Sequence, residues 1–125
     1  MNVPAELKYT SEHEWIRVEG DEIVIGVTDF AQGELGDVVF IEIETQGENL
    51  SLGDTFGTIE AVKTVSDLYM PVDGEVLEVN SALEDTPELV NSEPFEGGWM
   101  IRVKMSDPSQ LDDLMSAEAY SALIG

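Results

Sequence analysis

Residues 60–76 read EAVKTVSDLYMPVDGEV, and this stretch decides the fold. Alternating apolar residues in and just before it predict two strands, Thr55 to Glu60 and Val65 to Met70. If these strands pair with each other, Ala61-Val62-Lys63-Thr64 forms the tip of a hairpin. The stretch therefore predicts a lysine held at a turn between two antiparallel strands.

The rest of the chain from Glu14 to Lys104 shows similar short apolar runs separated by Gly, Asp, Asn and Pro, which is typical of a mostly antiparallel β domain. Further strands are expected over Trp15 to Val18, Ile23 to Val27, Val38 to Glu44, Glu75 to Val79 and Trp99 to Val103. A helical turn is expected from its N-cap Thr28 to its end at Gly33. Residues 80–98 are expected to be irregular, because two prolines interrupt them.

A change of period after Met105 predicts a helical C-terminus. Asp107 is a good N-cap, Pro108 suits the first helical position, and Ser116 is a point where the segment breaks into two short helices. The chain is thus expected to be one mainly β domain over residues 1–125, with a β core over about 14–105 and a helical segment over about 107–124.

Composition limits the partners and the chemistry. The 125 residues include 27 acidic and 5 basic side chains, for a formal net charge of -22, so nucleic acid and anionic membrane surfaces are excluded as partners. The absence of Cys and the single His exclude a thiolate nucleophile, disulfides and a zinc site built from Cys and His. No metal site is expected.

Targeting signals are not visible in the sequence. The first residues lack the basic and apolar regions of a signal peptide, and no apolar run approaches the roughly 18 residues that cross a bilayer. We therefore expect a soluble cytoplasmic protein.

Catalytic motifs are weak. His13 is the only imidazole, and no Gly-x-Ser-x-Gly elbow accompanies it. Residues 57–64 match a phosphate-binding loop except that Val62 stands where the second glycine is needed, and the chain that follows is strand-like. No catalytic residue is predicted, and the protein is expected not to be an enzyme.

Charge patterning singles out one amine. Between Arg17 and Arg102 lie 20 of the 27 acidic residues and a single cation, Lys63. A lysine at a hairpin tip is a common solubilising choice. It is also suited to selective acylation, because few amines compete with it and a rigid turn would present an attached arm to solution. The pattern alone leaves both readings open.

Several blocks, in order, resemble the glycine cleavage H-protein family. Residues 60–76 are similar to its lipoyl-attachment segment. Other matching blocks are His13-Glu14-Trp15, residues 35–42, residues 87–91 and Gly98-Trp99-Met100. The resemblance covers nearly the whole chain and implies a lipoyl-domain-like β-sandwich, also called a barrel-sandwich hybrid, with short helices at the C-terminus.

The resemblance also implies a function. Lys63 falls on the lipoylated lysine, so lipoate is the expected covalent cofactor. The chain would be a non-catalytic carrier that takes the aminomethyl group of glycine from a pyridoxal-phosphate glycine decarboxylase to a tetrahydrofolate-dependent aminomethyltransferase. Dihydrolipoamide dehydrogenase would then reoxidise the arm, and a lipoate-attaching enzyme would install it. We expect a monomer, because a carrier visits several active sites.

Two sets of site residues follow from the same blocks. Glu60, Val62 and Thr64 are expected to help a modifying enzyme recognise the attachment hairpin. Glu14, His13 and Asp67 are candidates for a cleft that shelters the loaded arm, in which a carboxylate would pair with a cationic amine.

The sequence departs from the family pattern at two places. Ala61 stands where Ser is common, and Glu44-Thr45-Gln46-Gly47 replaces a turn that usually contains Leu-Pro-Glu. Three other classes are compatible with a lysine at a hairpin tip. A biotinyl carrier is disfavoured by Val62 and Thr64, because Met usually flanks a biotinylated lysine. The others are a lipoyl domain of a 2-oxoacid dehydrogenase and an unmodified acidic interaction domain.

Overall fold

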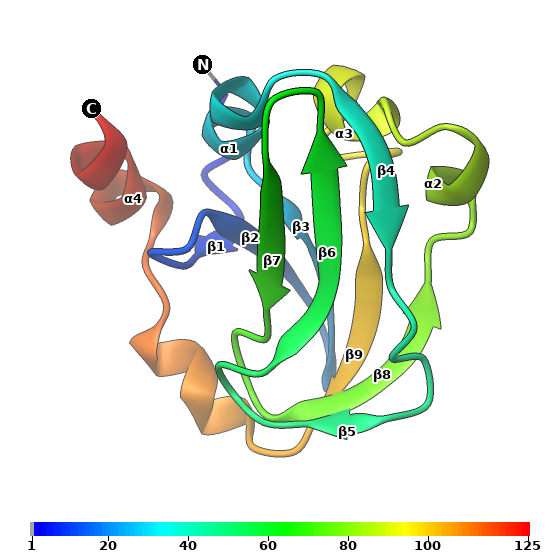
Figure 1. Ribbon diagram of the computed structural model, residues 1–125. Coiled ribbons are helices and arrows are strands. Elements are labelled where there is room, and N and C mark those ends of the chain that lie inside the picture. The colour runs from blue at the N-terminus through cyan, green and yellow to red at the C-terminus, as the bar shows by residue number, and fades with distance from the viewer. Residues whose placement is uncertain (1) are drawn as a thin grey trace.

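The structure is a computed structural model of the chain and describes residues 2–125. Its strands form two sheets that share a hydrophobic core (Figure 1). The strands are β1 (Lys8–Tyr9), β2 (Glu14–Glu19), β3 (Glu22–Val27), β4 (Val38–Glu42), β5 (Asn49–Leu50), β6 (Thr55–Ala61), β7 (Val65–Tyr69), β8 (Gly74–Val79) and β9 (Ile101–Met105). The helices are α1 (Asp29–Leu35), α2 (Ala82–Asp85), α3 (Leu89–Ser92), the 3-10 helix η1 (Pro108–Asp113) and α4 (Ala117–Ile124). The predicted mainly β class is confirmed.

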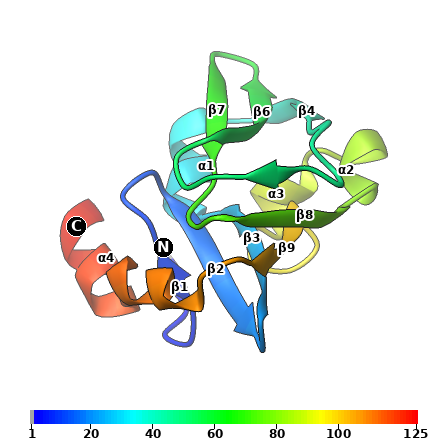
Figure 2. The same ribbon diagram turned by 90° about the horizontal axis from the view of Figure 1, so that it is seen from below.

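The larger sheet has the order β1-β2-β3-β9-β8-β5, with antiparallel pairing throughout. The smaller sheet has the order β4-β6-β7 and is also antiparallel. Seen from below, β6 and β7 lie across the molecule from β2 and β3 (Figure 2). Alternate residues of both sheets face the core, among them Ile16 and Ile25, which pair across β2 and β3, and Ile59 of β6.

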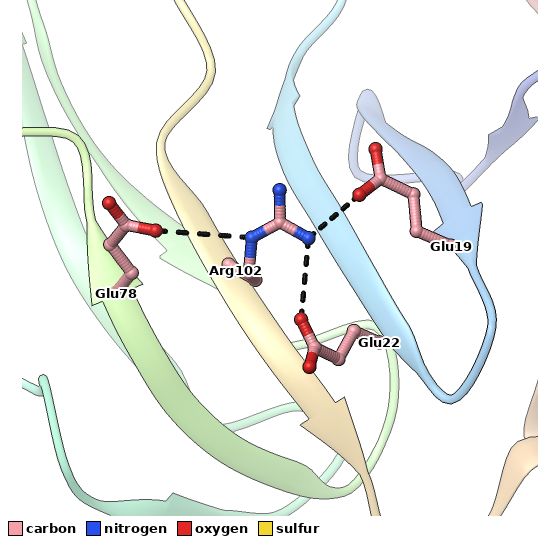
Figure 3. A network of polar contacts seen from close by, with 4 residues as sticks. All are labelled: Glu19, Glu22, Glu78 and Arg102. Atoms are coloured by element: carbon pink, nitrogen blue, oxygen red, sulfur yellow. Dashed lines mark hydrogen bonds and ion pairs between the residues drawn. The ribbon is translucent and has the colours of Figure 1, made fainter.

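Arg102 of β9 contacts carboxylates on three other strands of the larger sheet, β2, β3 and β8 (Figure 3). Its Nη1 donates to Glu19 at 2.7 Å and to Glu22 at 3.3 Å, and its Nε lies 3.9 Å from Glu78. All four side chains are partly exposed, so the network contributes modestly to stability. It places one cation among three carboxylates that would otherwise repel one another.

Helix α1 is longer than predicted. Its N-cap is Thr28 as expected, with the Thr28 hydroxyl accepting from the Ala31 amide at 3.1 Å. The predicted end at Gly33 is wrong, because the helix continues to the buried Leu35 and ends at Gly36. Gly36 has φ +82° and its amide bonds the Gln32 carbonyl, whereas Gly33 is an ordinary helical residue.

The expected strands are present with shifted ends. β4 ends at Glu42 instead of Glu44, because a turn begins at Thr45, whose carbonyl accepts from the Glu48 amide. β9 begins at Ile101 instead of Trp99, because the Trp99 amide closes a turn onto the Glu96 carbonyl at 3.2 Å. The two-residue strands β1 and β5 have no sequence signal of their own.

The segment 80–98 is less irregular than predicted, since α2 and α3 each form one helical turn on either side of Pro87. The C-terminal break at Ser116 is confirmed: its hydroxyl caps α4, while Asp107 caps η1. Helix α4 docks through Tyr120, which stacks on Tyr9 with ring centroids 4.7 Å apart. Among residues 2–125, no helix combines the length and apolar character needed to cross a membrane.

Candidate functional site: a lysine at a hairpin tip

Lys63 is exposed at the turn between β6 and β7, near the top of the molecule in Figure 1. The strands pair up to Glu60 and Val65, and the Ala61 amide then donates to the Thr64 carbonyl at 2.8 Å. The hairpin is also held from outside, because the Val62 amide donates to the Asp37 carbonyl at 3.0 Å. Backbone bonds on two sides therefore fix the direction in which the lysine leaves the fold.

The segment that holds the hairpin is itself anchored by Asn91 of α3. The Asn91 side chain accepts from the Val38 amide at 2.8 Å and donates to the Gly36 carbonyl at 2.9 Å and to Gln32 at 3.0 Å. A single amide thus joins α3, the end of α1 and the start of β4. Sequence reasoning assigned no role to Asn91, because its three partners lie 53 to 59 positions away along the chain.

The Lys63 side chain lies over Gly36. A Cβ placed on Gly36 would stand 3.3 Å from the lysine Cε and 3.9 Å from its Nζ. The ion pairs found among residues 2–125 all involve Arg102, so the lysine amine is in none of them. Glu60, Val62 and Thr64, predicted to help recognise the attachment hairpin, are all exposed beside it.

A groove of about 570 Å³ opens near the end of β7 that is farther from Lys63. Its walls come from the loop before β2, the ends of β5 and β7, and the end of η1. The lining residues include Thr10, Ser11, Leu52, Tyr69 and Leu114. Glu14, the first residue of β2, also lines it.

Glu14 is 2% exposed, unlike most acids of this chain. Its carboxylate accepts from the Thr10 hydroxyl at 2.9 Å and from the Tyr69 amide at 3.1 Å. Burial raises the pKa of Glu14 to about 7, and these two hydrogen bonds limit the rise. The groove therefore holds a carboxyl group that exchanges a proton near neutral pH and would ionise fully beside a cation.

His13 and Asp67 do not line the groove. His13 has φ +70°, and its Nδ1 lies 2.9 Å from the Tyr120 hydroxyl, which lies 2.7 Å from the hydroxyl of Thr28. The imidazole thus takes part in docking α4. Asp67 is exposed on β7, between the lysine and the groove.

The spacing along β7 relates the lysine to the groove. Leu68 faces the core, so Val65, Asp67 and Tyr69 share the outer face. At about 3.3 Å per residue, Asp67 lies about 13 Å and Tyr69 about 20 Å from Lys63 along the chain. An arm of about 14 Å on the lysine can therefore lie along β7 as far as Asp67, one outward-facing residue short of the groove-lining Tyr69.

The comparisons with known proteins agree with this geometry. The model of the family described as "Glycine cleavage H-protein" matches residues 7–125. The chain belongs to the glycine cleavage H-protein family. It is 58% identical over 125 residues to the glycine cleavage system H protein of Staphylococcus saprophyticus, covering 100% of this chain and 99% of the relative. It is 59% identical over 124 residues to that of Bacteroides thetaiotaomicron, covering 99% and 98%.

A solved structure extends the likeness to the fold. The H protein from Mycobacterium marinum superposes with a TM-score of 0.90 at 35% identity, covering 98% of this chain and 99% of that one. The predicted lipoyl-domain-like fold is thereby confirmed. H-proteins carry lipoate in the glycine cleavage system, so this chain is a carrier component of that system.

The site suits such a group. Lipoate attaches through an amide to a lysine, and Lys63 offers an exposed amine on a rigid turn, with a groove farther along β7. Nothing at the hairpin resembles a metal site: among residues 2–125, no three His, Cys, Asp or Glu side chains are placed to hold an ion.

Proposed function

We propose that Lys63 carries the lipoyl group and that this chain moves the aminomethyl group of glycine between enzymes of the glycine cleavage system. The observation that carries the proposal is the exposed, ion-pair-free Lys63 at a hairpin fixed on two sides, in a family of lipoate carriers. When bound, the lipoyl group supplies a dithiolane that accepts and releases the one-carbon cargo.

Three enzymes are the proposed partners: a pyridoxal-phosphate glycine decarboxylase that loads the carrier, a tetrahydrofolate-dependent aminomethyltransferase that unloads it, and a dihydrolipoamide dehydrogenase that restores it. The chain supplies no catalytic residue in this scheme. Its part is to hold Lys63 in a constant direction and to leave the hairpin free on its outer side. We further propose that it acts as a cytoplasmic monomer.

The groove gives the carrier a second task. We propose that Glu14 binds the cationic amine of the cargo, which lowers the pKa of this carboxyl from about 7 and holds it ionised. Thr10 and the Tyr69 amide orient the carboxylate toward the groove. Asp67 lies on β7 between the lysine and the groove, where its charge favours the approach of a cation. The buried site excludes most water and so slows hydrolysis of the cargo.

Replacement of the lysine tests the attachment. Lys63→Arg keeps the positive charge and the fold, but guanidinium is not acylated by an amine-directed ligase. The variant is expected to show no lipoyl mass increment and no carrier activity, while Lys104→Arg, at an exposed lysine of β9, retains both. The measurement is intact mass, together with release of carbon dioxide from glycine. Glycine decarboxylation supported by Lys63→Arg as the only carrier would overturn the proposal.

A second variant tests the groove. Glu14→Ala is expected to accept the cargo at a rate within about twofold of the parent's, yet to lose it to water at least about tenfold faster, since one charge-assisted hydrogen bond is removed. Formaldehyde released from loaded carrier in the absence of aminomethyltransferase measures the loss. Glu84→Ala, at an exposed acid of α2 that does not line the groove, is the control. Equal lifetimes for the Glu14 variant and the parent would show that this carboxyl shelters nothing.

A further inference from the structure

Exposed apolar side chains gather around the lysine. Seven large hydrophobic residues of the described chain are exposed, and four of them lie at the hairpin: Val39 at 54%, Phe40 at 48%, Val62 at 75% and Val65 at 61%. We call these four the hairpin patch. Single exposed apolar side chains are common on protein surfaces, whereas a cluster of them indicates an interaction site. The cluster is notable here because the chain has a net charge of -22.

The backbone brings the four together. Phe40 of β4 pairs with Glu60 of β6, which pairs with Val65 of β7, so Phe40 and Val65 flank Glu60 on the outer face at about 10 Å from each other. The register of β4 shifts between Val38 and Phe40, and this bulge leaves Val39 exposed next to Phe40. Val62 is tied to the same edge by its bond to the Asp37 carbonyl.

Carboxylates lie within the hairpin patch and around it. Asp37, Glu42, Glu60 and Asp67 are all exposed, and the last three lie on the outer face of β4, β6 and β7. These strands contain no Lys or Arg, so Lys63 is the only basic side chain of the hairpin and of the three strands of the small sheet. The surface thus offers apolar side chains with one carboxylate, Glu60, between Phe40 and Val65 and further carboxylates at its edge, and a complementary partner has apolar and basic side chains.

We propose that the hairpin patch is the docking surface for the lipoate-attaching enzyme, an inference that rests on the proposed attachment at Lys63. That enzyme forms an amide bond between the lysine Nζ and the carboxyl carbon of lipoate activated as its adenylate; AMP leaves, and the protons of the ammonium pass to water. Its active site must therefore reach Nζ and cover the surface around it. Enzymes that act on the far end of the arm work about 14 Å away and need not cover this surface.

Substitutions in the hairpin patch are expected to weaken binding of the lipoate-attaching enzyme and to leave the rate of amide formation nearly unchanged. Truncating a central aromatic side chain in such an interface weakens association by about tenfold. Phe40→Ser is expected to raise the KM of the chain for lipoyl transfer by about that factor with kcat within about twofold, because the amine itself is unchanged. Val62→Ser changes the most exposed member of the patch and is expected to raise the KM by about threefold. Because Val62 packs little against the core, this effect cannot be attributed to a disturbed core.

The test uses the full unlipoylated chain, the lipoate–protein ligase of its source cell, ATP and lipoate, with modification followed by intact mass. Leu123→Ser and Val18→Ser are matched controls, since these residues are 53% and 41% exposed and lie away from the hairpin. Circular dichroism establishes that each variant is folded. A raised KM for both patch variants but neither control supports the proposal.

Two other outcomes overturn it in different ways. If Phe40→Ser and Val62→Ser are lipoylated on Lys63 with the parent's KM, the docking surface lies elsewhere while the attachment site stands. If the parent chain itself gains no lipoyl group on Lys63, both the docking surface and the proposed function fail.

Discussion

Glu14 shows how one residue carries both a stability cost and a function. A carboxyl with ordinary exposure has a pKa near 4.5, whereas burial raises that of Glu14 to about 7. In the folded state the group therefore holds its proton between these values, while the unfolded chain has already released it. Its ionisation in the fold opposes stability, which is tolerable where the charge serves to bind a cation.

The pH dependence of stability tests this assignment. Because the folded pKa is raised, Glu14 lowers the free energy of unfolding as pH rises from about 5 to about 7.5, by up to about 3 kcal/mol. In Glu14→Gln that contribution is absent, so the variant is expected to gain stability relative to the parent across this range. Urea unfolding from pH 5 to 8 measures the difference. Glu60→Gln, at an exposed position, controls for the loss of one negative charge. A constant difference between Glu14→Gln and the parent would contradict the raised pKa.

Some residues of the candidate site could be predicted from the sequence and others could not. Lys63 was predictable because hairpin pattern and charge distribution single it out locally. Glu14 was proposed for the cleft from the resemblance, but its burial depends on Tyr69, which lies 55 positions away. His13 was grouped with Glu14 as its neighbour, yet its Nδ1 lies 2.9 Å from the hydroxyl of Tyr120, 107 positions away along the chain. Such separations are set by tertiary contacts that no local pattern contains.

At the scale of elements, the end of α1 matters most for the hairpin. The sequence offers two glycines, and the nearer one, Gly33, was the predicted end. The buried Leu35 and the bonds from Asn91 favour one further turn, which ends at Gly36. Strand positions, by contrast, followed from alternation, since a half-buried strand repeats every two residues. The ends of the strands could not be predicted in this way, because turns at Thr45 and Trp99 end the extended backbone although the alternation continues.

Gly36 links that helix end to the lysine, and its replacement should be costly. Gly36→Ala places a side chain at φ +82° and within 3.3 Å of the Lys63 Cε, so we expect a loss of about 1 kcal/mol in the free energy of unfolding. Gly33→Ala meets nothing within 4 Å and lies inside the helix, so a gain of about 0.5 to 1 kcal/mol is expected. Chemical denaturation of both variants measures the two shifts. If Gly36→Ala is at least as stable as the parent, Gly36 does not need its glycine conformation.

At the scale of the whole molecule, charge and fold have separate roles. The two sheets and their shared core fix the geometry of one hairpin, while the acidic surface repels nucleic acid and other copies of the same chain. The fold class could be predicted from periodicity, but the order of strands in the larger sheet could not. That order joins β3 to β9, whose paired residues Ile25 and Ile101 lie 76 positions apart.

The net charge of -22 leads to a prediction about partner association. Long-range attraction to basic docking surfaces speeds encounter, and salt screens it, with a Debye length of about 10 Å at 0.1 M. Association rates with the decarboxylase and the aminomethyltransferase are therefore expected to fall by about tenfold or more between low salt and 0.5 M NaCl. Stopped-flow mixing over a salt series measures them. For the lipoate-attaching enzyme, whose proposed docking surface is the hairpin, the double variant Glu60→Gln/Asp67→Asn should reduce the slope against salt more than Asp112→Asn/Glu118→Gln, which removes two exposed acids of the C-terminal segment. Equal slopes for the two double variants would mean that net charge alone steers the encounter, and rates independent of salt would mean that charge does not steer it.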